Sequence, residues 1–464
     1  MHTLPFTLAR LSAAYASGLS PKAVVAETYR RIAEAADPGI FLHLAEEESV
    51  AAAADALGAY DPAKPLYGIP FAVKDNIDVA GMPTTCACPA FEYQAAKDAF
   101  VVARLREAGA LPIGKTNLDQ FATGLVGLRS PYPIPKNALD PAIVPGGSSS
   151  GSAVAVARGL VPFALGTDTA GSGRVPAALN NIVGLKPSLG SLSASGMVPA
   201  CRTLDTISIF ALTVEDAFAA FSAAAGYDEA DGYSRAFPPP VMEAPAAGYA
   251  IGVPDAASRR FFGDDTQEAS FEATLAVLER LGHRILPLDF APFYRIASLL
   301  YDGAWVAERY AGIEDLMRDR PEALHPVTRA IIGRAESLRA VDVFRDIYRL
   351  ADLKRAAAPL LSAVDLLCVP TIPRFVTTAE IEADPIGPNS QLGTYTNFVN
   401  LIDLCGIAVP VAARADGRPG NVTLLAPAGN DGRIAALASL LQADAGEPLG
   451  ATGWALEAPL LASA

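Results

Sequence analysis

Two serine-containing glycine loops hold the residues of this chain best suited to nucleophilic chemistry. The first is VPGGSSSGSAVAVARG over 144–159, and the second is GTDTAGSGRVPAA over 166–178, with Ser172 between Gly171 and Gly173. Successive small residues let backbone N–H groups converge on one point, and such a nest binds an oxyanion. Either loop alone is also compatible with a plain turn, so the interpretation depends on a base that activates a serine.

Histidine and lysine are the candidate bases. GSSSG matches the GxSxG nucleophile elbow with Ser149 at its centre, and that elbow needs a histidine later in the chain. Only His283 and His325 follow, and neither stands at the end of an expected strand. Lys74 closes the apolar run 71–73, and burial there would lower its pKa and favour the neutral amine. A lysine at a strand end is more often solvated, so Lys74 by itself decides nothing.

A third pattern, GALPIGKT over 109–116, matches the phosphate-binding pattern GxxxxGK[ST]. That pattern holds phosphate where the loop opens a helix, because loop amides and the helix N-terminus bind the anion. Here a helix is expected before the match, and residues 111–113 are strand-like. We therefore interpret Lys115 as a strand-end residue, either exposed or paired, and a nucleotide-binding module remains the remote alternative.

Composition restricts the class of protein. The chain has 464 residues, of which 51% are hydrophobic and 19% charged, and its formal net charge is −14. An acidic surface repels phosphate backbones, which argues against a nucleic-acid partner. The five cysteines lack zinc spacing, so we expect reduced thiols, a cytoplasmic protein and no metal. We expect neither a signal peptide nor a membrane span, since no apolar run approaches about 18 residues.

Strand and helix signals alternate along the chain, which indicates an α/β sheet covered by helices on both faces. The segment from about 213 to 355 is mostly helical in pattern. The clearest helices are expected within 20–35, 98–110 and 152–160, and the clearest strands within 67–81, 111–117, 161–171, 364–373, 406–413 and 420–427.

These patterns resemble the amidase signature family. GGSSSGSAVAVARGLVPFALGTDTAGSGRVPAA covers that family's signature almost throughout, and GIPFAVKDNIDVAG, GKTNLDQFATG and GTYTNFVNLIDLCGIAVPV look like further family blocks. The resemblance implies the amidase signature fold, a large mixed β-sheet covered by helices on both faces. It implies a single domain over 1–450, with a helical substrate-binding insertion at about 213–355. Residues 451–464 would be a tail, either the start of a further C-terminal domain or the end of a member lacking one.

The resemblance also implies a Lys–cis-Ser–Ser triad. Carried over by position, Lys74 is the base, Ser148 the bridging serine and Ser172 the nucleophile. The peptide bond between Gly147 and Ser148 is implied to be cis. Ser149 is expected to support Ser148 by hydrogen bonding.

Further roles are implied around the implied nucleophile. Asp168 and Arg174 flank it, and we expect them to pair and hold its loop, with a substrate contact as the alternative role of Arg174. No cofactor is implied. The backbone N–H groups expected to stabilise the oxyanion belong to Thr169, Ala170, Gly171 and Ser172.

A narrower resemblance is to the allophanate hydrolases of this family. The common family form at the nucleophile is Gly-Gly-Ser-Ile-Arg, and Ala170 and Gly173 depart from it as those enzymes do. LLYDGAWVAERY resembles their substrate-binding helix, which implies that Tyr301 and Arg309, eight residues apart on one helix, hold the substrate carboxylate. Gly124 is also implied in substrate binding.

The implied reaction is hydrolysis of allophanate, a small anionic amide, to ammonia and N-carboxycarbamate through an acyl-enzyme. The resemblance further implies a homodimer and a functional link to a biotin-dependent urea carboxylase. The alternatives within the family are a small-amide amidase and the amidating component of a tRNA-dependent amidotransferase.

Overall fold

The strand Pro70–Lys74 (β2) shows how this sequence builds a sheet that is buried on both faces. Side chains alternate along a strand, so Phe71 and Val73 pack into one hydrophobic cluster, while Ala72 packs into another on the opposite face. Helices α4 (Phe100–Glu107), α7 (Val214–Ala224) and α16 (Asp431–Ala445) supply the first cluster, and α5 (Ser150–Ala157) supplies the second. The expected covering of both faces is confirmed.

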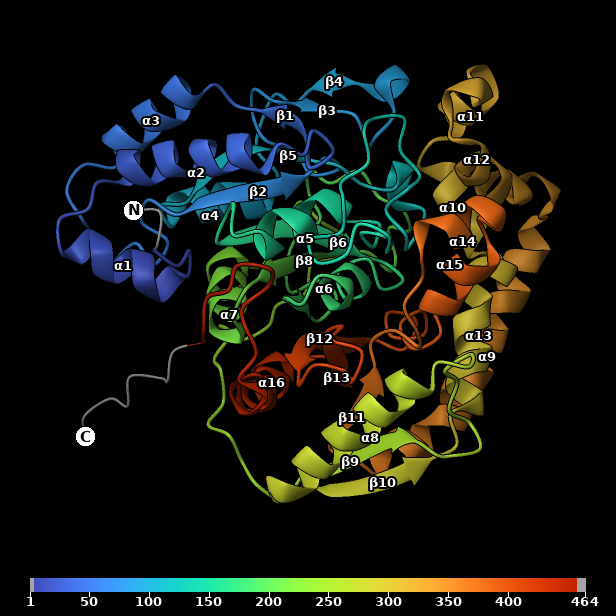
Figure 1. Ribbon diagram of the computed structural model, residues 1–464. Coiled ribbons are helices and arrows are strands. Elements are labelled where there is room, and N and C mark those ends of the chain that lie inside the picture. Colours follow the sequence, from blue (N-terminus) through green and yellow to red (C-terminus); the bar gives the residue numbers. More distant parts are fainter. Residues whose placement is uncertain (1–3, 457–464) are drawn as a thin grey trace.

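The computed structural model describes residues 4–456 (Figure 1). Its central sheet has 11 strands in the order β1-β5-β2-β6-β8-β7-β12-β13-β11-β9-β10. Neighbours run antiparallel, except that β2 is parallel to β5 and β6, and β9 is parallel to β10 and β11. The remaining strands of the sheet are β1 (Phe41–Leu44), β5 (Leu111–Thr116), β6 (Phe163–Asp168), β7 (Val183–Lys186), β8 (Thr206–Ala211), β9 (Ala250–Pro254), β10 (Arg284–Leu288), β11 (Leu366–Pro370), β12 (Leu404–Val411) and β13 (Gly420–Pro427).

The helices expected near the N-terminus and around the glycine loops are present. Helix α2 (Pro21–Ala35) begins as its sequence predicts, with the Ser20 side chain accepting a hydrogen bond from the Ala23 N–H. The other helices are α1 (Leu8–Ala16), α3 (Glu47–Ala56), α6 (Val175–Leu179), α8 (Asp265–Arg280), α9 (Ala291–Asp302), α10 (Trp305–Ala311), α11 (Glu314–Asp319), α12 (Pro326–Gly333), α13 (Ala340–Ser362), α14 (Thr378–Ala383) and α15 (Gly387–Leu392). Short 3₁₀ turns lie at η1 (Pro89–Phe91), η2 (Gln120–Ala122), η3 (Pro321–Ala323) and η4 (Arg334–Ser337), and β3 (Pro83–Thr84) pairs with β4 (Tyr93–Gln94).

The segment 213–355 is mostly helical, as expected, but it also contributes β9 and β10 to one end of the sheet. Strand β10 is an edge strand and is only partly buried, although residues 285–288 are all apolar. Helices α9 to α13 lie beside the sheet, on the right in Figure 1. Helix α9 packs in the same hydrophobic cluster as Ala170, so this part of the segment borders the second glycine loop.

The chain beyond residue 450 still contacts the main body. Leu449 and Trp454 form an isolated bridge, and the Ala451 N–H donates to the carbonyl of Ala157 at the end of α5. The part of the expected tail over 457–464 lies outside the described residues. Within 4–456, no helix is long and apolar enough to cross a membrane.

Candidate active site

The strand β2 delivers Lys74 to the first glycine loop. Lys74 lies two positions after Ala72, so it points to the same face of the sheet, where α5 packs. Its side chain is fully buried, with Nζ 2.7 Å from the Ser148 Oγ and 2.7 Å from the Thr167 Oγ1. Ser148 lies just before α5, and the Gly147–Ser148 peptide bond is cis. The structure thus brings the lysine and the first serine of the implied triad into contact.

The surroundings of Lys74 favour its neutral form. Burial lowers the pKa of Lys74 to about 7, because removal from water disfavours the charged ammonium. The carboxylates of Asp119, Asp205 and Asp168 raise this pKa, but their effect is smaller than that of burial. At neutral pH a substantial fraction of Lys74 is therefore an amine that can accept a proton.

Ser172 lies in the loop between β6 and α6. Asp168 ends β6, and its carboxylate accepts hydrogen bonds from the N–H groups of Gly171 (2.8 Å) and Gly173 (3.1 Å). The same carboxylate forms a fully buried ion pair with Arg174 at 2.9 Å. Ser172 is 3% exposed, and its hydroxyl forms no hydrogen bond with any other described residue. The pairing expected of Asp168 and Arg174 is present, while the Arg174 Nη1 is buried and has no hydrogen-bond partner within residues 4–456.

The sheet explains why this loop lies near Lys74. Strands β2 and β6 are parallel neighbours, with Val73 opposite Leu165. Parallel neighbours end at the same edge of a sheet, so the loop that leaves β6 starts beside the end of β2. The hydrogen bond between Lys74 and Thr167 joins these two strand ends directly. Sequence reasoning did not single out Thr167, which carries no motif of its own.

The loop before Ser172 offers backbone donors for an anion. The N–H of Gly171 is already bound within the loop, whereas those of Thr169, Ala170 and Ser172 form no hydrogen bond within residues 4–456. The Thr169 hydroxyl donates to the half-buried carboxylate of Asp205, which anchors the loop from the other side. Three of the four expected oxyanion donors are therefore available, and the fourth is engaged.

Ser149 has a different partner from the one expected. Its hydroxyl donates to the Thr167 carbonyl and accepts from the Thr167 N–H, both at 3.3 Å. The side chain thus ties the first glycine loop to β6 and does not bond to Ser148. The support that Ser149 gives to the site is indirect, through the position of Thr167 beside Lys74.

The histidines required by an elbow mechanism lie elsewhere. His283 stacks on Tyr249, with ring centroids 5.4 Å apart. His325 caps the start of α12, where its Nδ1 accepts from the Val327 N–H. Neither forms a hydrogen bond with Ser149 in the described chain, so the elbow pattern has no histidine base here.

Lys115 in the GALPIGKT segment is fully buried. It pairs with Asp75 at 3.1 Å and donates to the Thr84 hydroxyl at 2.8 Å. Because the segment forms the strand β5, its amides belong to the sheet and not to a phosphate-binding loop. Of the two expectations for Lys115, the paired one is confirmed and the exposed one is wrong.

Tyr301 and Arg309 meet, although they do not share a helix. Helix α9 ends at Asp302 and α10 begins at Trp305, with Gly303 between them. The Ala304 N–H donates to the carboxylate of Asp346 on α13, which fixes the break. The expected single helix is wrong, and the contact arises from the turn.

The guanidinium of Arg309 is buried, with only 2% of the residue exposed. It donates to the hydroxyls of Thr123 (3.1 Å) and Tyr301 (3.4 Å) and to the carbonyl of Ala122 (3.4 Å). Its Nε has no partner, and no carboxylate pairs with it within residues 4–456. Arg309 is therefore a buried cation whose direct hydrogen-bond partners are all neutral oxygens.

Gly124 and Gly147 both lie against Asp119, a buried residue that sequence reasoning missed. A Cβ on Gly147 would lie 2.0 Å from the Asp119 Oδ2, and one on Gly124 would lie 2.5 Å from it. The Asp119 carboxylate accepts from the N–H groups of Gly127 and Arg129, both at 2.9 Å. Glycine is required at both positions because any side chain would collide with this carboxylate, which lies between the segment at Gly124 and the loop before Ser148.

The comparisons with known proteins agree with this geometry. The sequence model of the Amidase family matches residues 23–435. The chain belongs to the amidase family. It is 48% identical over 364 residues to the urea amidolyase of Saccharomyces cerevisiae, covering 78% of this chain and 20% of that protein. The chain therefore spans about one fifth of the length of that relative.

Two further comparisons cover a larger share of the matched protein. The allophanate hydrolase of Kluyveromyces lactis superposes with a TM-score of 0.92 at 39% identity, covering 97% of this amidase and 75% of that chain. The A component of the glutamyl-tRNA(Gln) amidotransferase of Thermus thermophilus is 34% identical over 443 residues, covering 88% of this amidase and 91% of that protein. The mixed α/β fold with its 11-stranded sheet is that of the amidase family.

The buried lysine leads to a prediction about pH. A base must be unprotonated to act, so we expect amide hydrolysis to rise with pH through about 7 and then level off. The measurement is kcat/KM against pH, with circular dichroism recorded at each point to show that the protein remains folded. A rate that falls as pH rises through 7 would contradict a lysine base.

Proposed function

We propose that this amidase hydrolyses allophanate through a triad of Lys74, Ser148 and Ser172. Ser172 attacks the carbonyl of the terminal amide, and its proton passes through Ser148 to Lys74. The 2.7 Å contact between Lys74 and Ser148 supports the second half of this relay. The free amides of the Ser172 loop receive the oxyanion as it develops.

The later steps return one proton to the leaving nitrogen and one to Ser172. Lys74, through Ser148, protonates the leaving nitrogen, so ammonia departs and an acyl-enzyme remains on Ser172. Water then attacks the acyl carbon and gives a proton to the same two residues, which pass it to the departing Ser172 oxygen, so N-carboxycarbamate leaves and the serine hydroxyl is restored. One water is consumed for each C–N bond broken, and no redox partner or cofactor enters the reaction.

The observation that supports an anionic substrate is the buried, unpaired guanidinium of Arg309. A charge held away from water is costly unless an opposite charge or strong acceptors compensate it. The carboxylate of allophanate would supply the missing partner, with the Tyr301 hydroxyl as a second donor. We place that carboxylate at Arg309 and Tyr301, next to Gly124, and the terminal amide at Ser172.

Substitution of Arg309 tests this assignment. For Arg309→Ala we expect KM for allophanate to rise roughly ten- to hundredfold, the cost of losing a hydrogen bond to a charged group. We expect kcat to fall as well if the amide is no longer aligned with Ser172. The measurement is steady-state ammonia release from allophanate.

A matched substrate serves as the control for Arg309→Ala. Biuret has the size and shape of allophanate but carries an uncharged amide in place of the carboxylate. The substitution should affect any hydrolysis of biuret much less than that of allophanate. An unchanged kcat/KM for allophanate would show that its carboxylate binds elsewhere.

The amidating component of a tRNA-dependent amidotransferase is the second candidate, since the relative from Thermus thermophilus matches over 91% of its own length. The formal charge of −14 argues against a surface that approaches tRNA. Ammonia release from a panel containing allophanate, biuret, glutamine and simple aliphatic amides separates the candidates. Preference for glutamine would favour the amidotransferase, and preference for simple neutral amides a small-amide amidase.

Four further expectations from the sequence stay proposals. We propose a cytoplasmic location, which the free, buried state of Cys86, Cys88, Cys201, Cys368 and Cys405 supports. The match to urea amidolyases supports a functional link to a urea carboxylase. A homodimer and the division near residue 450 remain as proposed from the sequence.

A further inference from the structure

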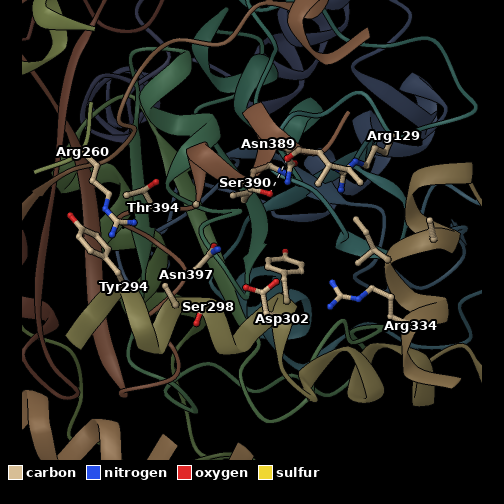
Figure 2. A pocket seen from close by; sticks show the side chains of 17 residues that line it. Arg129, Arg260, Tyr294, Ser298, Asp302, Arg334, Asn389, Ser390, Thr394 and Asn397 are labelled. Carbon is tan, nitrogen blue, oxygen red and sulfur yellow. Dashed lines mark hydrogen bonds between the residues drawn. The ribbon is translucent and has the colours of Figure 1, made fainter. Parts of the chain in front are cut away.

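A cavity of about 380 Å³ opens beside the candidate site (Figure 2). One wall is α9, with Tyr294, Ser298 and Tyr301, and the opposite wall is α15 with the chain that follows it. None of Lys74, Ser148 and Ser172 lines the cavity, but Tyr301 and Asn397 do. These two residues connect the cavity to the candidate site.

Two contacts place the inner end of the cavity at the proposed substrate site. Tyr301 lines the cavity, and its hydroxyl accepts a hydrogen bond from Arg309 at 3.4 Å. Asn397 also lines it, next in sequence to Thr396, whose Oγ1 would lie 2.4 Å from a Cβ on Gly171. One wall thus touches the carboxylate subsite, and the other touches the loop of Ser172.

The charges that line this cavity are predominantly positive. Arg129, Arg260 and Arg334 line it, and Asp302 is the one carboxylate among its lining residues. None of the three arginines forms an ion pair within the described chain. This is unusual for a protein whose formal net charge is −14, where carboxylates outnumber cations overall.

The guanidinium groups of Arg129 and Arg260 contact uncharged groups. Arg129 is 2% exposed, donates to the carbonyls of Thr123 and Pro385, and keeps a buried Nε with no partner. The Arg260 guanidinium lies 4.0 Å from the centroid of the Tyr294 ring. Because carbonyls and a ring do not cancel a full charge, the positive field of these groups extends into the cavity.

We propose that this cavity is an arginine vestibule, formed by Arg129, Arg260 and Arg334, that gathers small carboxylate anions and passes them to Arg309. The proposal rests on the anionic substrate of the proposed function and adds the route by which that anion arrives. A cavity lined by one sign of charge raises the local concentration of the opposite ion and its association rate. Without it, the acidic surface would repel the substrate.

Arg260 and Arg334 are the residues to test, because both are exposed and neither closes a buried hydrogen bond. In the double variant Arg260→Gln/Arg334→Gln, we expect kcat/KM for allophanate to fall roughly three- to tenfold at about 0.01 M salt. At about 1 M salt, where screening acts over about 3 Å, the difference from wild type should vanish. The value of kcat itself should change little, because Arg309 still aligns the bound substrate.

The matched control is Arg349→Gln/Arg355→Gln. These arginines are exposed on α13, line no part of the cavity and change the net charge by the same amount. We expect this variant to behave like wild type at both salt concentrations. Equal losses in the two double variants, or a loss in the vestibule variant that persists unchanged at high salt, would overturn the proposal.

A binding measurement separates this proposal from the proposed function. In the Ser172→Ala background, where substrate stays intact, titration calorimetry gives the affinity for allophanate directly. We expect Arg260→Gln/Arg334→Gln to weaken that affinity at low salt by the same factor as kcat/KM, and Arg349→Gln/Arg355→Gln to leave it unchanged. Equal affinity in both would overturn the vestibule alone, whereas failure of wild type to release ammonia from allophanate would overturn the proposed function.

Discussion

Ser172→Ala is expected to lower the rate of ammonia release from allophanate by at least about four orders of magnitude. The substitution removes the one hydroxyl of the second loop that is free of protein partners, and with it the acyl-enzyme route. It leaves the Asp168–Arg174 ion pair and the backbone donors intact, so the thermal midpoint should stay close to that of wild type. The assay is ammonia release at saturating substrate, and the midpoint is measured by circular dichroism.

Ser149→Ala is the matched control, since it removes a serine hydroxyl from the other glycine loop. The Ser149 hydroxyl bonds to the backbone of Thr167, so its loss should destabilise the fold by about 1 kcal/mol and keep activity within about tenfold. The elbow interpretation requires the opposite pattern. If Ser172→Ala kept full activity and Ser149→Ala were inactive, Ser172 would be rejected as the nucleophile.

Lys74→Met is expected to reduce kcat by at least about three orders of magnitude, since general-base catalysis is lost. Methionine has nearly the volume of lysine, so it fills the buried site. It carries no charge, like the neutral form of Lys74 that its lowered pKa of about 7 favours. The residual rate should also lose the rise with pH near 7. The measurement is the pH profile of kcat for wild type and variant, with melting curves as the check on folding.

The profile of Lys74→Met also tests other titrating groups nearby. Burial raises the pKa of Asp205 to about 6, and Asp205 holds Thr169 at the start of the Ser172 loop. If the variant kept the wild-type rise at the same midpoint, Lys74 would not be its source. Asp205→Asn would then be the next variant to examine.

The elements that position the triad could be predicted from sequence because they are short, buried and locally marked. Strands β2 and β6 are continuous apolar runs between glycines and prolines, and the two loops that follow or face them carry the family motif. The meeting of Lys74 and Ser172 was implied by the family resemblance, and the structure supplies the reason, because β2 and β6 are parallel neighbours that end at one edge of the sheet. For these two strands, the apolar runs in the sequence and the buried strands in the structure agree.

Other features could not be read from sequence because they depend on distant partners. The turn at Gly303 is fixed by Asp346, more than forty residues later, so an unbroken helix was the natural expectation for Tyr301 and Arg309. The role of Asp119 follows from two glycines that come close only in the folded chain. The arginine vestibule likewise joins residues from three separate segments, none of which carries a motif.

The most direct test of the central claim is the site of covalent labelling by phenylmethanesulfonyl fluoride, mapped by peptide mass spectrometry. The triad predicts one sulfonyl group on Ser172, formed in parallel with loss of activity and faster as pH rises through about 7. It predicts no label on Ser172 in Lys74→Met over the same time. A sulfonyl group on Ser149, or complete inactivation with Ser172 unmodified, would contradict the triad.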